Sequence, residues 1–239
     1  PPPHHPDPPT RLAGHSMGGL ICLDVLSRHP DCLPLLESLV LVASPVGGAD
    51  LGRLFDPLSL GLGLARALGT NRRPLAEKIA AHIPTLIIAG DYDGGSDGVV
   101  PIECTKFRQA SYVTVNNINH NRMKKHPAVA SIIQAFWQNK DRLCVPTAIE
   151  TYCDRIIRQL QTIPGITDAH YRGFQSSQIW AYLPAGLRLR TWQNRLGIHH
   201  VFLSNQAGDC LFAGFVGWPH TAALYETLQH ISKDSKASA

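Results

Sequence analysis

The sequence lacks the patterns that place a chain in a membrane or on nucleic acid. Its longest apolar stretch, residues 58–69, contains an arginine and falls short of the roughly 20 apolar residues that a membrane-spanning helix needs. The net charge of +4 comes without a long block of lysine and arginine, so no phosphate-binding track is expected. These absences predict a globular protein with no membrane span and no nucleic-acid partner.

The sequence also lacks the cysteine spacing of a metal site or a redox motif. Its six cysteines are dispersed, and neither a C-x-x-C pair nor a paired Cys/His spacing for zinc is present. Dispersed cysteines are typical of buried free thiols, which favours a reducing compartment, and no secretory signal is visible. We therefore expect a cytoplasmic protein that uses no metal ion or other cofactor.

The length and composition allow one medium domain with a smaller one. The chain has 239 residues, of which 44% are hydrophobic, enough for a sizeable core. Residues 1–10 include six prolines and no apolar pattern, which predicts a proline-rich tail. The remainder changes character near residue 145, where we expect a domain boundary.

Residues 11–144 alternate between apolar runs of strand length and helical patterns. The runs lie at 10–14, 37–44, 84–90 and 111–117, and amphipathic helical patterns lie at 17–29 and 126–138. Continuous apolar runs are typical of parallel strands covered on both faces. We predict an α/β domain with a parallel sheet and flanking helices, interrupted by a cap-like insertion at about 45–82.

Residues 145–239 have the pattern of a small α+β domain with antiparallel strands. A helical pattern at 147–160 precedes five short strand-like pieces, at 169–174, 178–183, 187–193, 199–205 and 210–216, and a final helix begins at 221. Trp180, Trp192 and Trp218 are expected in the core of this domain. Its role is not indicated by any motif.

The residues from Gly14 to Gly18 read G-x-S-x-G, with a strand pattern before them and a helical pattern after them. A serine in this setting is held on a sharp turn, and the two glycines stand where side chains would collide as the chain turns. A serine hydroxyl becomes a nucleophile only with a base, a group that orients the base, and donors for the oxyanion. The motif predicts Ser16 as a nucleophile, provided that these partners exist.

Three aspartates follow the third apolar run and could orient the base. We expect Asp97 to do so, because the two valines behind it anchor its turn, and Asp93 is the alternative acid. The alternating aspartates also resemble a calcium loop that starts at Asp91. The fifth position of that loop is Gly95 and the twelfth is Ile102, which does not favour calcium.

A histidine follows the fourth apolar run. His120 lies in a polar loop before the next helix, where its ring could accept the Ser16 proton while Asp97 orients it. His126, at the start of that helix, is the alternative base.

The order Ser16, Asp97, His120, with each residue after its own strand, resembles that of the α/β-hydrolase superfamily, and in particular its lipase and esterase-like members. The matching segments are GHSMGGL, LVLVASPVGGADLG, GDYDGGSDGVVP and NHNRM, and they extend over about residues 10 to 140. The resemblance implies an α/β-hydrolase-like sheet and hydrolysis of carboxylic esters or thioesters through an acyl-enzyme on Ser16. It also implies a small-molecule ester or acyl substrate and an oxyanion donor at the Met17 backbone N–H.

The resemblance leaves alternatives open. Members of the superfamily have several strands before the serine turn, including the loop with the second oxyanion donor, whereas a proline-rich decapeptide precedes it here. A missing N-terminal segment or a partner chain is therefore expected, and a catalytically inactive interaction module is an alternative. Acyl transfer by the same triad is another. The leucines of the insertion at 45–82 could form a lid with an apolar underside.

Overall fold

The computed structural model describes residues 10–48, 71–139, 151–171 and 173–237. They divide into two compact units. Unit 1 contains residues 10–46 and 72–139, and unit 2 contains residues 47–48, 71 and the described residues from 151 onward. The tail at 1–9 and the leucines expected to form the lid lie outside the described residues.

Unit 1 is built on a four-stranded parallel sheet. The strands follow one another in space in the order β1-β2-β3-β4, and the parallel sheet predicted from the apolar runs is confirmed. Their bounds are β1 Thr10–His15, β2 Leu36–Val42, β3 Thr85–Asp91 and β4 Ser111–Asn116.

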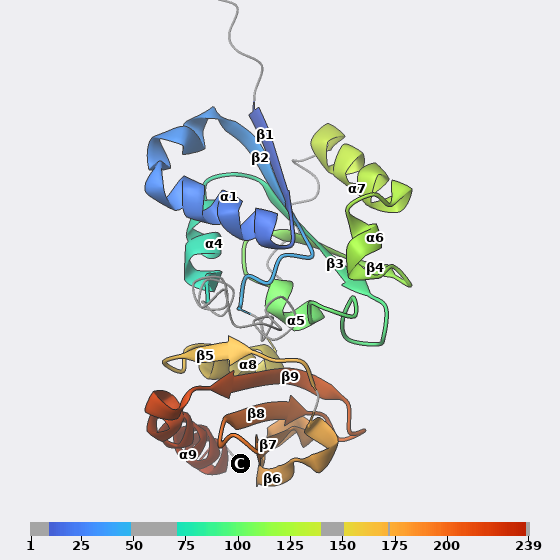
Figure 1. Ribbon diagram of the computed structural model, residues 1–239. Helices are drawn as coiled ribbons and strands as arrows, with labels where there is room; N and C mark the ends of the chain where they lie inside the picture. Colours follow the sequence, from blue (N-terminus) through green and yellow to red (C-terminus); the bar gives the residue numbers. More distant parts are fainter. Residues whose placement is uncertain (1–9, 49–70, 140–150, 172, 238–239) are drawn as a thin grey trace, which may run out of the picture. The chain divides into compact units, whose positions relative to one another are not determined.

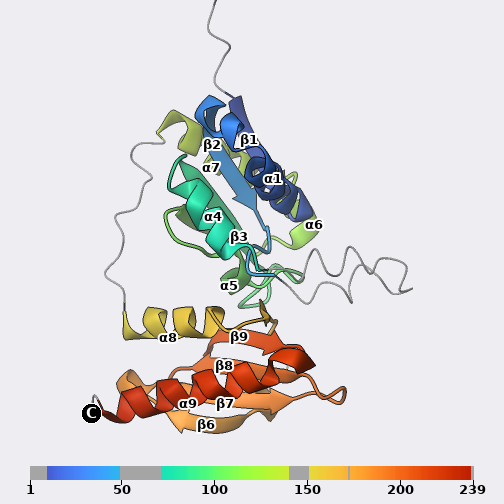
Figure 2. The same ribbon diagram turned by 90° about the vertical axis from the view of Figure 1, so that its left-hand side faces the viewer.

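Helices cover both faces of this sheet, as Figures 1 and 2 show. One face carries α1 Met17–Arg28 and α4 Arg73–Ala80, and the other carries α7 Pro127–Gln138. Two short helices, α5 Ile102–Thr105 and α6 His120–Met123, lie in the connections after β3 and β4, and the 3₁₀ helix Pro30–Leu35 precedes β2. The layers are those expected of an α/β domain.

The two central strands are buried on both faces because their side chains alternate between two helix layers. One set of their side chains, Val40, Val42, Leu86 and Ile88, packs with Val129 and Phe136 of α7. The alternate positions, such as Leu41 and Ile87, are equally buried. This double burial explains the continuous apolar runs in the sequence.

Two buried arginines fix α4 in unit 1. Arg72 makes a two-pronged ion pair with Asp24 of α1, with N···O distances of 2.9 and 3.0 Å. Arg73 donates to the carbonyl oxygens of Lys106 and Glu103, both at 2.9 Å. Buried charges need such partners. These contacts join α4 to α1 and to α5, which follows the loop at residues 91–100, here called the acidic loop.

Unit 2 is a five-stranded antiparallel sheet with two helices, as the sequence predicts. The strand order is β5-β9-β8-β7-β6, and side chains of both helices share a core with one side of the sheet. The elements are α8 Tyr152–Gln161, β5 Ile166–Asp168, β6 Gln178–Tyr182, β7 Arg188–Gln193, β8 His199–Ser204, β9 Cys210–Val216 and α9 Thr221–Ala237, with 3₁₀ turns at Phe174–Ser176, Pro184–Gly186 and Trp218–His220.

Two expectations for unit 2 were wrong. The first strand is Ile166–Asp168 and not residues 169–174, because Gly173 adopts a left-handed φ of 88° against the ring of Trp192 and a 3₁₀ turn follows. Trp180 and Trp218 are exposed, by 40% and 68%, rather than in the core. Trp180 lies on the edge strand β6, and the Trp218 indole N–H donates to the Leu196 carbonyl oxygen.

Two other expectations from the sequence concern the burial of the cysteines and the absence of a membrane-spanning helix. Of the five cysteines within the described ranges, Cys104 alone is buried and the others are half-buried, so burial of all the thiols was not a correct expectation. No helix among the described residues has the length and apolar character that crossing a bilayer would require.

Candidate active site

Ser16 lies on the turn between β1 and α1, in a backbone conformation that non-glycine residues rarely adopt. Its φ is 55° and its ψ is −124°, and such positive φ values cost on the order of 1–3 kcal/mol in a residue with a side chain. The Ser16 N–H donates to the carbonyl oxygen of Val42 in β2, at 2.8 Å. The strained serine is thus fixed to the neighbouring strand at the carboxyl end of the sheet.

The turn requires glycine at two positions, and one of them is not the position that the motif predicted. A Cβ on Gly14 would lie 2.5 Å from backbone atoms of Gly19, so β1 and α1 can approach only without it. A Cβ on Gly18 would have no described atom within 4 Å, and the expected collision there was wrong. Gly19, which the motif did not single out, fills that role, because its Cβ would lie 2.1 Å from the Ser44 Oγ.

Alanine substitutions at these glycines should separate in their effect on stability. Gly14→Ala is expected to lower the free energy of unfolding of unit 1 by about 1–3 kcal/mol, because strand and helix must move apart. Gly18→Ala is the matched control and should be neutral or slightly stabilising in helix α1. Urea unfolding followed by circular dichroism measures both, and equal losses would contradict the close approach at Gly14.

His120 is the first residue of α6 and faces Ser16. Its Nε2 lies 2.9 Å from the Ser16 Oγ, and the residue is 5% exposed. The side chain of the preceding Asn119 caps α6 by accepting the Arg122 N–H. The local sequence Asn-His therefore starts a helical turn and presents the imidazole to the serine.

Asp97 completes a continuous chain of hydrogen bonds. Its Oδ2 lies 2.7 Å from the Nδ1 of His120, and its Oδ1 accepts the N–H groups of Val99 and Val100, at 3.0 and 2.7 Å. The residue is 1% exposed. Charge-assisted bonds of this kind stabilise a buried carboxylate, and here they come from the backbone N–H groups of the two valines.

The alternative residues occupy other positions. The Asp93 carboxylate accepts the N–H and the hydroxyl of Ser96, at 2.9 and 2.8 Å, and so fixes the loop on which Asp97 stands. The His126 ring caps α7 by accepting the Ala128 N–H at 3.2 Å. The structure therefore brings Ser16, His120 and Asp97 together. The side chains of Asp93 and His126 instead fix a loop and cap a helix.

The acidic loop is ordered by its own backbone. Asp91 Oδ1 accepts the N–H groups of Gly94 and Gly95, at 2.8 and 3.0 Å. Across the ranges that the structure describes, no group of three or more His, Cys, Asp or Glu side chains is placed to hold a metal ion. The alternating aspartates are thus turn-forming residues in this structure.

Met17 is the first residue of α1 and directly follows Ser16. The first N–H groups of a helix have no acceptor within the helix, and they carry a partial positive charge. The Met17 N–H, which the resemblance implies as an oxyanion donor, is one of these groups. Its side chain is 42% exposed.

One contact at this site was not foreseen from the sequence. The Nε2 of His15 lies 3.0 Å from the carbonyl oxygen of His120, and the two ring centroids are 4.7 Å apart. Burial is the main cause that lowers the pKa of His15 below its ordinary value, and the nearby His120 and Lys124 lower it too, against opposing effects of the hydrogen bond and Asp97. His15 occupies the position before the serine in G-x-S-x-G. Because the motif allows any residue there, it did not single out His15.

This lowered pKa predicts a loss of stability on acidification. Below about pH 6.5 the unfolded chain binds a proton at His15 while the folded chain still excludes it, so stability falls as the pH decreases through this window. Glutamine does not titrate. The free energy of unfolding of His15→Gln should therefore fall less steeply than that of the wild type as the pH is lowered from about 7 to about 5. Urea titrations at several pH values test this, and identical slopes for both proteins would contradict it.

The arrangement of unit 1 also shows its fold type. The serine turn, the acidic loop and the histidine follow β1, β3 and β4 of one parallel sheet, in that chain order. Unit 1 has an α/β-hydrolase-like fold.

Solved structures with similarity to part of this chain include esterases and a lipase. A thermophilic esterase is 18% identical, with 54% of this chain and 65% of that chain covered and a TM-score of 0.37. A putative non-heme bromoperoxidase of Mycobacterium tuberculosis is 20% identical, with coverages of 55% and 68% and a TM-score of 0.40. A lipase of Bacillus licheniformis is 16% identical, with coverages of 55% and 65% and a TM-score of 0.40.

The chain spans just under two thirds of the length of the thermophilic esterase and of the lipase. No protein-family model and no curated protein sequence matches it.

Proposed function

We propose that this chain is a serine hydrolase that cleaves carboxylic esters or thioesters through an acyl-enzyme on Ser16. The observation that carries the proposal is the unbroken series of contacts from Asp97 through His120 to Ser16, with heavy-atom distances of 2.7 and 2.9 Å. A nucleophile, a base and an orienting acid in hydrogen-bond reach are what acyl transfer requires.

The tautomer of His120 follows from its partners. A carboxylate accepts hydrogen bonds only, so the Nδ1 that faces Asp97 carries the proton and the Nε2 accepts the Ser16 hydroxyl proton. Asp97 is held by two backbone N–H groups and is almost fully buried. It is therefore fixed in the orientation that stabilises the imidazolium formed when His120 accepts the proton.

In the first step, Ser16 Oγ forms a bond to the carbonyl carbon of the ester and its proton moves to His120 Nε2. The carbonyl oxygen becomes an oxyanion that the Met17 N–H stabilises. The bond to the leaving alcohol or thiol then breaks, and the leaving atom takes the proton from His120. In the second step a water molecule loses a proton to His120 Nε2 and attacks the acyl carbon. The bond between that carbon and Ser16 Oγ then breaks, and Oγ takes the proton from His120, which releases the carboxylic acid and regenerates Ser16.

A covalent probe tests the proposal directly. Incubation with a fluorophosphonate should label the wild-type chain at one position, because an activated serine attacks the phosphorus and displaces fluoride. Ser16→Ala should remove the label, and mass spectrometry should place it on the peptide that contains Ser16. A folded wild-type chain that remains unlabelled would overturn the proposal.

A further inference from the structure

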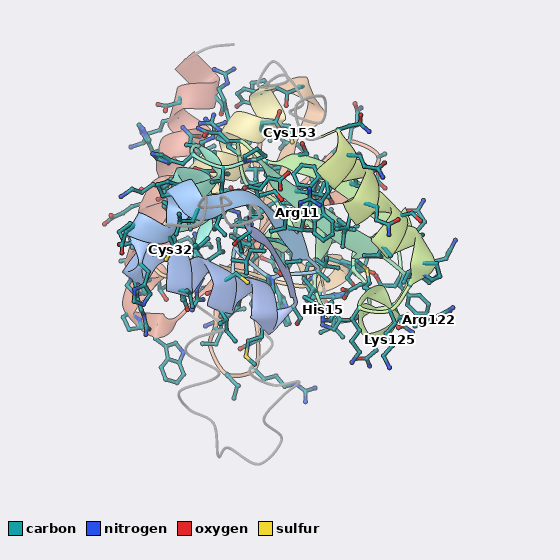
Figure 3. The ribbon with its side chains drawn as sticks, turned by 90° about the horizontal axis from the view of Figure 1, so that it is seen from above. Arg11, His15, Cys32, Arg122, Lys125 and Cys153 are labelled. Atoms are coloured by element: carbon teal, nitrogen blue, oxygen red, sulfur yellow. The ribbon has the colours of Figure 1, made fainter. Side chains whose placement is uncertain are left out.

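We propose that His15 is a positioning residue that holds the base His120 against the nucleophile by donating a hydrogen bond to the His120 carbonyl oxygen. The inference rests on the proposed function, since it assigns a role within the same site. In Figure 3, His15 lies at the carboxyl end of β1, toward the segment that carries Arg122 and Lys125.

The direction of the bond between His15 and His120 follows from the atoms that meet. The 3.0 Å contact joins the His15 Nε2 to a carbonyl oxygen, which can only accept. The Nε2 therefore carries a proton and donates it. His15 is half-buried, and its lowered pKa agrees with a neutral ring that keeps this proton on Nε2.

This bond completes the fixation of the His120 backbone. The His120 N–H donates to the Asp97 carbonyl oxygen at 2.9 Å, and the His120 carbonyl oxygen accepts from His15. Both polar groups of the base's main chain are thus occupied, one by the acidic loop and one by the residue next to the nucleophile. The imidazole is left with rotation about its side-chain bonds as its main freedom, and its two nitrogens are held by Asp97 and Ser16.

The bond also joins two parts of the site that are far apart in sequence. His15 and His120 are separated by 105 positions, and Ser16 and His120 by 104. A shift of the β4–α6 connection would lengthen the distance from His120 Nε2 to Ser16 Oγ, and a displacement of about 1 Å can cost 10²-fold in rate. The His15 bond opposes that shift at the carbonyl group that is bonded to the Cα of His120.

Two substitutions separate the hydrogen bond from the ring. His15→Gln retains an amide N–H that can reach the position of Nε2, whereas His15→Phe retains an aromatic ring and loses the donor. We expect the rate constant of fluorophosphonate labelling to fall about 10- to 100-fold in His15→Phe and to stay within about threefold of the wild type in His15→Gln. With a p-nitrophenyl ester, His15→Phe should lower kcat and leave KM near its wild-type value.

The outcomes separate a positioning role of His15 from a role in packing alone, and they test the proposed function independently. Labelling of His15→Phe at the wild-type rate, or equal loss in His15→Gln, would overturn the positioning role while Ser16-dependent labelling of the wild type upholds the hydrolase. If His15→Phe does not fold, His15→Asn replaces it, since its shorter amide does not reach the carbonyl oxygen. Slow labelling of a folded His15→Asn, with the rate restored in His15→Gln, supports the positioning role, and labelling as fast as the wild type opposes it.

Discussion

His120→Gln should lower kcat for a p-nitrophenyl ester by about 10⁴- to 10⁶-fold, an effect as large as that expected of Ser16→Ala. The N–H groups of Val99 and Val100 still hold the Asp97 carboxylate, so the fold of unit 1 should persist. It cannot accept the proton of Ser16 Oγ and return it to the leaving group. Steady-state kinetics measures the loss, with thermal unfolding by circular dichroism as the check of folding.

His126→Asn is the matched control for the base. Asparagine at the start of α7 can accept the Ala128 N–H as His126 does, so both stability and kcat should remain close to the wild type. The double variant Ser16→Ala/His120→Gln should be no slower than either single variant, because the two residues act as a unit. A large loss of kcat in His126→Asn, with activity retained in His120→Gln, would assign the role of base to His126 instead of His120.

Asp97→Asn should lower kcat by about 10⁴-fold. An amide in this position can donate a hydrogen bond to His120 Nδ1, which would move the ring proton to Nε2 and leave no acceptor for the Ser16 hydroxyl. It also loses the negative charge that stabilises the imidazolium. The loss should appear in kcat more than in KM, because it arises as charge develops on the imidazole.

Asp93→Asn provides the control within the same loop. Its amide oxygen can still accept from Ser96, so the loop should keep its conformation and activity should fall by less than about tenfold. Kinetics of both variants at one pH gives the ranking. If Asp93→Asn lost more activity than Asp97→Asn, the acid would have to be reassigned to Asp93.

The sequence predicted the fold of unit 1 and the residues that meet at its site for a simple physical reason. Parallel strands end at one edge of a sheet, so Asp97 and His120, which follow strands of the same parallel sheet as β1, lie on the same edge as Ser16. The choice of Asp97 over Asp93 as the favoured acid depended on the two valines behind it, and their N–H groups hold its carboxylate. The catalytic roles of these residues stay predictions until they are tested.

Other features depend on contacts between residues that no local pattern records. Gly19 is needed because Ser44, which follows a different strand, lies against it. The role of His15 depends on a carbonyl oxygen 105 positions away. Residues 169–174 have the composition of a strand, but the ring of Trp192 lies against Gly173 and a 3₁₀ turn forms instead. Local propensity is a weak guide wherever such tertiary contacts decide the backbone.

Strand β1 is less protected from solvent than the central strands β2 and β3. Within the described residues it lies at the edge of the sheet and pairs with β2, and Thr10, Arg11 and Ala13 are exposed, whereas β2 and β3 are largely buried. Peripheral elements with few buried contacts exchange their amide hydrogens through local openings that cost less free energy than global unfolding. Ser16 follows such a strand, so we expect local opening to separate Ser16 from His120 while the centre of the sheet remains folded.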